Sequence, residues 1–98
     1  MKTRNEYIGL LRASANFLKE HFGVRSLRLF GSVARNEQHE GSDVDVCVDM
    51  QPNLFRRIEM KDYLEQLLGC SVDVIREHKN MNAFLKSQIE KDGIYVFQ

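Results

Sequence analysis

The chain runs DVDVCVD over residues 43–49, and this heptapeptide decides the fold. Valine occupies every second position, which is the period of a β-strand with one buried face. Asp43 and Asp45 therefore share the opposite face with Cys47 and Asp49. We expect a strand whose valine face is covered by helices and whose aspartate face is more open.

Helices and strands alternate on both sides of this segment. A capping box of Thr3 and Glu6 begins an amphipathic helix that ends at Gly23, and residues after 31 form a turn and a brief second helix. Further strands are expected at 26–30, 70–75 and 94–97, a third helix between Pro52 and Leu68, and a last helix at about 80–91. The order αβαβαβαβ predicts an α/β (α+β) fold, a mixed sheet of about four strands with helices on one face. We expect the first, third and last helices to cover the valines.

The composition excludes several classes of protein. The 98 residues, 43% hydrophobic and 29% charged, fit one globular domain near the lower size limit. Fourteen basic residues balance fourteen acidic ones, which argues against direct binding of nucleic acid. No apolar run approaches the ~20 residues of a membrane span or the core of a secretory signal. Cys47 and Cys70 lack metal-ligand spacing and fall on opposite strand faces, so we expect reduced thiols in a cytoplasmic protein that binds no membrane.

Three aspartates are the candidate metal ligands and catalytic groups. Asp43 and Asp45 lie two residues apart on one strand face, with Cα atoms ~6.6 Å apart, and carboxylate oxygen is the ligand that Mg²⁺ prefers. Asp73 interrupts the apolar strand VDV at 72–74 and could complete a carboxylate triad or act as a general base. The alternative is that these residues simply solvate the outer face of a sheet. An EF-hand is excluded, because its glycine and glutamate positions are occupied by Val48 and Leu54.

A Gly-Ser turn follows the strand at 26–30. Backbone N–H groups at Gly31 and the hydroxyl of Ser32 could hold phosphate oxygens, although such turns often only reverse the chain. The Gly-Lys-Ser/Thr sequence of a Walker A loop is absent. Arg35 could assist a phosphate oxygen or could be an ordinary solvated arginine.

Three segments taken in order, GSVAR at 31–35, SDVDV at 42–46 and VDV at 72–74, resemble the minimal nucleotidyltransferases of the DNA polymerase β superfamily. The resemblance covers nearly the whole chain, and it implies one minimal nucleotidyltransferase domain over residues 1–98 with a polymerase-β-like fold. One departure is Asn36, where family members usually have glycine. Asparagine tolerates positive φ better than most residues, so we expect the turn to persist.

The same resemblance implies the roles of the site residues. Gly31 and Ser32 would hold the terminal phosphates of the nucleotide, and Asp43 and Asp45 would bind two Mg²⁺ ions. Asp73 would help to bind metal and would activate the acceptor. Two metal ions would stabilise the attacking and leaving oxygens of an in-line displacement at the α-phosphate.

The acceptor is less determined than the chemistry. The resemblance implies an antitoxin that transfers AMP from ATP to a hydroxyl of a separate protein, a HEPN-domain toxin. Two alternatives stay open at this point. The chain could silence its partner by binding alone, or it could modify a small hydroxylated molecule such as an antibiotic, as a homodimer whose cleft is completed across subunits.

Overall fold

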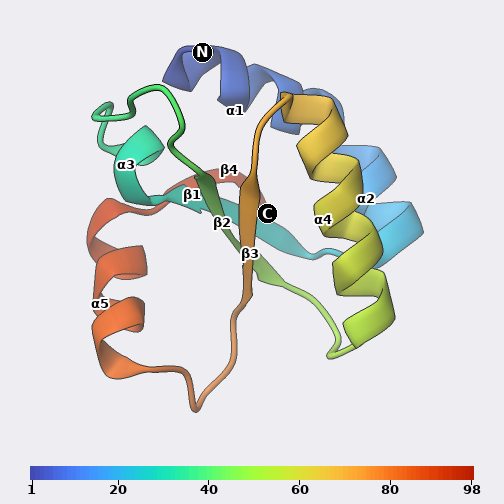
Figure 1. Ribbon diagram of the computed structural model, residues 1–98. Helices are drawn as coiled ribbons and strands as arrows, with labels where there is room; N and C mark the ends of the chain where they lie inside the picture. The colour runs from blue at the N-terminus through green and yellow to red at the C-terminus, as the bar shows by residue number, and fades with distance from the viewer.

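The computed structural model describes residues 1–98 and places a four-stranded sheet between helices (Figure 1). The strand order is β3-β2-β1-β4. The strands are β1 (Ser26–Phe30), β2 (Val44–Asp49), β3 (Val72–Arg76) and β4 (Ile94–Phe97). β1 pairs antiparallel with β2 and β4, whereas β2 and β3 are parallel. The predicted mixed sheet of four strands is confirmed.

Five helices connect and cover these strands. They are α1 (Arg4–Ala13), α2 (Ala15–Phe22), α3 (Gly31–Ala34), α4 (Leu54–Leu68) and α5 (Ala83–Asp92). With α1 and α2 counted together, the order is the predicted αβαβαβαβ. The predicted capping box at Thr3 and Glu6 is present, and Gly23 ends α2 in the left-handed conformation with φ 71°.

The predicted first helix is divided at Ser14, which has φ −95° and ψ 3°. Ser14 is buried, and its hydroxyl is hydrogen-bonded to the Tyr63 hydroxyl of α4 at 3.0 Å. A buried hydroxyl needs such a partner. The apolar periodicity could not indicate the break, because the partner lies 49 residues away in the sequence.

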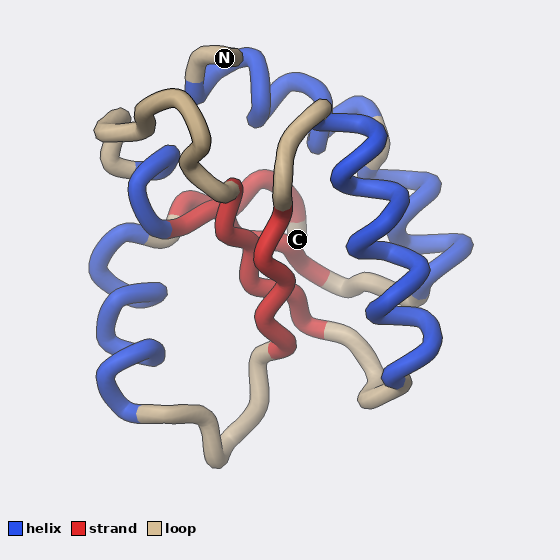
Figure 2. Tube along the Cα trace, in the orientation of Figure 1, coloured by secondary structure: helices blue, strands red, loops and turns tan.

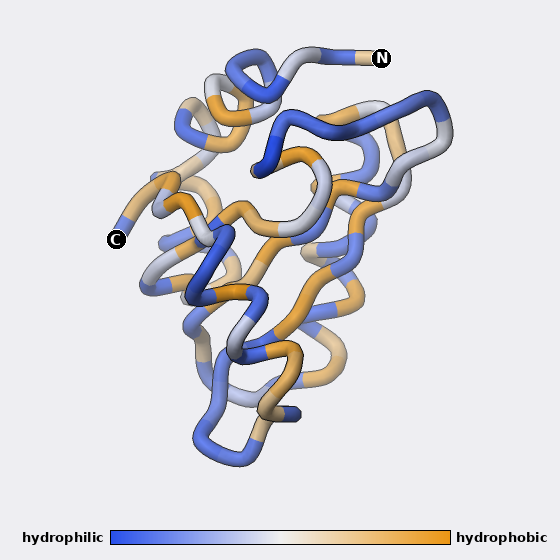
Figure 3. The backbone as a smooth tube through the Cα atoms, turned by 90° about the vertical axis from the view of Figure 1, so that its left-hand side faces the viewer, coloured by the Kyte–Doolittle hydropathy of each residue, from blue (hydrophilic) through white to orange (hydrophobic).

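The main hydrophobic core lies between one face of the sheet and helices α1, α2 and α4. Val44, Val46 and Val48 are each 0% exposed, as the alternating pattern predicts. They pack with Leu18 of α2 and Leu64 of α4 in one cluster of 18 buried residues. Figure 3 shows the hydrophobic stretches gathered in the central strands, with the connecting loops mostly hydrophilic. None of the helices is long and apolar enough to cross a bilayer.

The last helix packs on the other face of the sheet, so the prediction that it covers the valines is wrong. Ile89 of α5 is 1% exposed and joins Phe30 and Cys47 in a second apolar cluster, flanked by Ile75. In Figure 2, α5 and α3 lie on one side of the strands and α2 and α4 on the other. α5 therefore covers part of the aspartate face.

Strand order explains this placement. The connection through α4 runs from β2 to its neighbour β3, whereas the connection through α5 runs back across the sheet from β3 to β4. Both join parallel strands, and such crossovers are right-handed in nearly all proteins. Two right-handed crossovers that run in opposite directions along a sheet must lie on opposite faces.

The turn after α3 contains the left-handed residue that the sequence indicated. Asn36 has φ 61° and is the single non-glycine residue with positive φ. Its N–H donates to the Val33 carbonyl at 3.0 Å and closes the turn. The expectation that asparagine preserves this turn in place of glycine is confirmed.

Substitutions at Asn36 should report this conformation. Asn36→Ala should lower the free energy of unfolding by roughly 1 kcal/mol relative to Asn36→Gly, because a Cβ is unfavourable in the left-handed region. Asn16, exposed in α2, is the matched control. There Asn16→Ala should have a free energy of unfolding about 1 kcal/mol higher than that of Asn16→Gly. Urea denaturation of the four variants would measure both differences, and the same order at both positions would contradict the assignment.

Candidate functional site

Two of the three candidate carboxylates are direct neighbours across the sheet. Asp45 of β2 lies opposite Asp73 of β3 in the parallel register. Residues in register on adjacent strands point to the same face, with strand axes ~4.8 Å apart. Asp43 comes immediately before β2 and two residues before Asp45. Asp43 and Asp73 are exposed, whereas Asp45 is half-buried.

The Gly-Ser turn lies against Asp45. Phe30, the last residue of β1, is opposite Asp45 in the antiparallel pair, and Gly31 follows with φ 76°. A Cβ at Gly31 would overlap Oδ2 of Asp45 and would lie 3.1 Å from its Cγ. Glycine is therefore required here both for the left-handed backbone and for the space that the carboxylate occupies. Ser32 is the next residue, half-buried in α3.

Burial and neighbouring negative charge act together on the carboxyl of Asp45. Burial, and after it the negative charges of Asp73 and Asp43, raise the pKa of its carboxyl to about 6. The positive charge of Arg35 acts in the opposite direction. The site thus holds more negative charge than neighbouring cations balance, which favours binding of a cation.

Arg35 itself is held in two ion pairs. Its Nη1 donates to Oδ2 of Asp92 at 2.7 Å, and its Nε lies 3.3 Å from Oε1 of Glu37. The hydrogen bond to Asp92 is the main cause of the raised pKa of Arg35. The predicted phosphate contact of Arg35 stays a prediction. Its ion pair with Asp92, at the end of α5, was not anticipated, since nothing in the sequence indicates that these two turns meet.

The carboxylates suit Mg²⁺ held jointly with a substrate. No three His, Cys, Asp or Glu side chains lie close enough together to hold a metal ion by themselves. Mg²⁺ is commonly bound by one or two carboxylates together with substrate phosphates and water, instead of by a cage of protein ligands. The pair Asp45 and Asp73, with Asp43 beside it, matches that donor set in chemistry and in charge.

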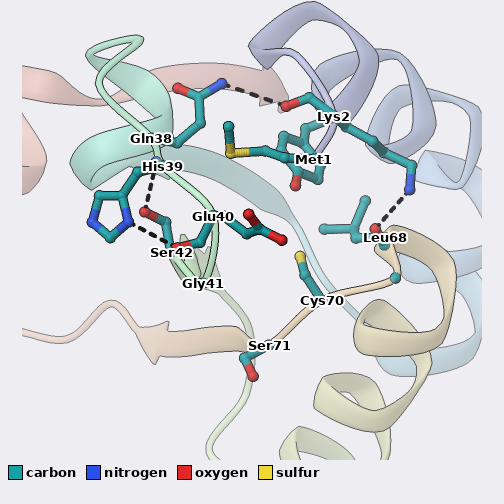
Figure 4. Close-up of a pocket in the computed structure, with 12 residues that line it drawn as sticks. Met1, Lys2, Gln38, His39, Glu40, Gly41, Ser42, Leu68, Cys70 and Ser71 are labelled. Carbon is teal, nitrogen blue, oxygen red and sulfur yellow. Dashed lines mark hydrogen bonds between the residues drawn. The ribbon is translucent and has the colours of Figure 1, made fainter.

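A pocket of about 340 Å³ borders this site without containing a carboxylate of the triad (Figure 4). It lies between the N-terminus, residues 38–42 and residues 68–71. Lys2 Nζ donates to the Leu68 carbonyl at 3.0 Å, and the His39 N–H donates to Ser42 Oγ at 3.0 Å. The first contact joins the N-terminus to the end of α4, and the second closes the loop that leads into Asp43.

The two cysteines are free, as predicted. Cys47 is buried beneath α5, and burial raises the pKa of its thiol, which favours the neutral form. Asp49, at the far end of the same strand face, is paired with Arg25 at 2.7 Å. The sequence placed Asp49 outside the site, and this ion pair gives it a separate role.

Comparison with known proteins gives a consistent result. The family model described as a nucleotidyltransferase domain matches residues 11–96. Protein adenylyltransferase MntA of Thermococcus cleftensis is 44% identical over 93 residues, covering 93% of this chain and 89% of the relative.

Two solved structures are also similar. A chain described as a minimal nucleotidyltransferase superposes with a TM-score of 0.76 at 32% identity, covering 95% of each chain. One chain of a mutant toxin–antitoxin MntA–HpeT superposes with a TM-score of 0.68 at 26% identity, covering 99% of this chain and 73% of that one.

The contact between Gly31 and Asp45 can be tested by a double-mutant cycle. Gly31→Ala should lower the free energy of unfolding by roughly 1–3 kcal/mol, through backbone strain and the collision with the carboxylate. Adding Asp45→Ala should restore the part that comes from the collision, so that the two effects are not additive. Urea denaturation of the single and double variants measures the coupling, and simple additivity would contradict the contact.

The raised pKa of Asp45 predicts a pH-dependent stability. Between about pH 4 and pH 6 the folded state binds this proton more tightly than the unfolded state, so the free energy of unfolding falls as the pH rises. Asp45→Asn should therefore raise the free energy of unfolding at pH 7.5 by roughly 1 kcal/mol, allowing for partial solvent screening, and hardly at pH 4. Thermal melts at both pH values without metal would test this, with Asp49→Asn as the control that gains nothing.

Proposed function

The chain belongs to the nucleotidyltransferase domain family, and we propose that it transfers AMP from ATP to a hydroxyl group of a separate acceptor protein, with residues 1–98 acting as one minimal nucleotidyltransferase domain. The observation that carries this proposal is the pairing of Asp45 with Asp73 beside the left-handed Gly31. A triphosphate could approach this turn closely, because Gly31 has no side chain there. Three carboxylates beside the turn provide the oxygen ligands that a nucleotide-bound Mg²⁺ needs.

Each residue has a distinct part in binding. Gly31 and Ser32 hold the terminal phosphates through the backbone N–H groups and the hydroxyl. Asp43, Asp45 and Asp73 would hold Mg²⁺. The metal, when bound, neutralises the phosphate charge and stabilises the attacking and leaving oxygens of the displacement.

Transfer then needs one proton to move. The acceptor hydroxyl gives its proton to the carboxylate of Asp73, which is exposed at the edge strand and reachable from solvent. The acceptor oxygen forms a bond to the α-phosphorus as the bond from that phosphorus to the oxygen bridging to the β-phosphate breaks. The products are an AMP ester of the acceptor and pyrophosphate.

The acceptor that we propose is a HEPN-type toxin, which the chain would silence as an antitoxin. Two similarities support this choice. The relative of 44% identity is named a protein adenylyltransferase, and a structural neighbour of 26% identity is half of a toxin–antitoxin pair. Silencing by binding alone would not need a partly buried carboxylate, Asp45, placed beside two further carboxylates, an arrangement that raises its pKa.

Substitution of the carboxylates tests the transfer directly. Asp43→Asn, Asp45→Asn and Asp73→Asn should each reduce transfer at least about a hundredfold while the protein stays folded, because each removes a metal ligand or the proton acceptor. Asp49→Asn, on the same strand face but paired with Arg25, should keep most of the activity. The assay incubates chain and acceptor with Mg²⁺ and ATP labelled at the α-phosphate and weighs both proteins by mass spectrometry. Activity retained in all three variants would reject the site.

A further inference from the structure

An uncovered groove runs along the edge strand next to the carboxylates. β3 ends the sheet on one side, with α4 flanking one of its faces and α5 the other (Figure 1). A groove of about 500 Å³ lies there, lined by Val74 and Arg76 of β3, Arg57 of α4, and Leu85 of α5. It begins directly after Asp73. A second pocket of about 330 Å³ adjoins it and shares Arg57 and Arg76.

The hydrogen bonds of β3 show which of its backbone groups face this groove. The Ser71 carbonyl accepts from the Val44 N–H at 3.0 Å, and the Glu77 N–H donates to the Val48 carbonyl at 2.8 Å. In a parallel ladder, alternate residues of a strand bond to the same neighbour. Odd-numbered residues of β3 therefore bond to β2, and even-numbered residues present their N–H and C=O groups at the open edge.

One of these even-numbered residues is already satisfied within the chain. The Val72 N–H donates to Oε2 of Glu65 at 3.0 Å. Val74 and Arg76 have no further strand beside them, and both line the groove. Exposed edge groups of this kind are a template for pairing with another extended chain.

The charges of the groove are of one sign. Its nine lining residues include Arg57 and Arg76 and no carboxylate, although the whole chain is neutral. Neither Arg57 nor Arg76 forms an ion pair, whereas Arg25, Arg28 and Arg35 each pair with acidic residues.

Apolar side chains also line the groove. Ile75, Met81 and Leu85 line it, and Leu54 lines the adjoining pocket with 59% of its surface exposed. A nucleic acid would use the positive charge but not the apolar side chains or the free backbone groups. An extended peptide with alternating acidic and apolar side chains would use all three.

We propose that this groove binds an extended acidic segment of the acceptor protein, which adds to β3 as a fifth strand and brings the modified hydroxyl to Asp73. The inference rests on the proposed function for the identity of the occupant. Main-chain hydrogen bonds to Val74 and Arg76 supply the pairing, and Arg57 and Arg76, which form no ion pair, select acidic side chains. The guanidinium of Arg76 already donates one hydrogen bond, to the Glu77 carbonyl at 3.3 Å. Because Asp73 directly precedes Val74 in β3, a segment paired with Val74 and Arg76 reaches the carboxylates at one end.

The test measures binding without nucleotide, so that it is independent of transfer. The probe is a fluorescent, end-blocked heptapeptide in which glutamate alternates with valine around a central tyrosine, titrated in an anisotropy assay. Arg57→Glu and Arg76→Glu should each weaken binding at least about fivefold. Arg56→Glu is the matched control, because Arg56 approaches Gly23 on the other side of α4, and it should change binding less than about twofold. If a charge reversal unfolds the protein, the neutral variants Arg57→Gln and Arg76→Gln replace it. Each of them should also weaken binding more than Arg56→Glu does.

Edge pairing is tested by amide hydrogen exchange. The peptide should slow exchange at Val74 and Arg76 and leave the amides of β4, at the other edge of the sheet, unchanged. Equal binding by the three charge-reversed arginine variants, or no slowing at Val74 and Arg76, would overturn the proposal. Tighter binding of a single-stranded oligouridylate of the same charge, lost in the same variants, would also overturn it in favour of a nucleic acid. Failure of AMP transfer to the bound peptide would count against the proposed function and would leave the docking groove in place.

Discussion

The parallel register of β2 with β3 is the constraint on which the remaining structure depends. It sets Asp45 directly beside Asp73, so that two like charges repel one another on one face of the sheet. The opposite face stabilises the same register, since Val44, Val46 and Val48 are completely buried and each contributes about 1.5–2 kcal/mol. A slip by one residue would reverse every side chain and place the carboxylates in the core. Hydrophobic burial on one face thus stabilises a repulsive arrangement on the other, which is why a small domain can maintain neighbouring carboxylates.

The turn at Gly31 removes solvent from one of the three carboxylates. Asp45 is pressed against that backbone and loses solvent, whereas Asp43 and Asp73 remain exposed. Desolvation is accordingly the largest cause of the raised pKa, ahead of the two neighbouring charges. The same turn provides a surface without side chains where phosphate groups could approach. A substrate that carries both a metal ion and phosphate groups would neutralise the carboxylates and place its phosphates at the turn at the same time.

Patterns within a few residues were sufficient to predict much of this arrangement. Alternation identified the strands, and the carboxylate of Asp73 within an apolar strand indicated that this strand lies beside β2. The left-handed turn at Asn36 was indicated by the family resemblance, because glycine is usual at that position. Contacts that depend on strand order could not be predicted in this way. The placement of α5 follows from the direction of the β3–β4 crossover, which no local pattern contains, although Phe30 and Ile75 on the aspartate face were apolar residues in need of cover. The break at Ser14 and the ion pair of Arg35 with Asp92 likewise join segments that are distant in the sequence.

The ion pair between Arg35 and Asp92 has a consequence for communication within the molecule. Asp92 is the last residue of α5, where the partial negative charge of the helix terminus disfavours a carboxylate. Arg35 compensates both charges from the turn that follows Gly31 and Ser32. Any anion that draws Arg35 away leaves the end of α5 less stable, and anything that fixes α5 makes Arg35 less available to that anion. The turn after Gly31 and Ser32 and the helix α5 are therefore linked thermodynamically, with a coupling free energy that is necessarily the same in both directions.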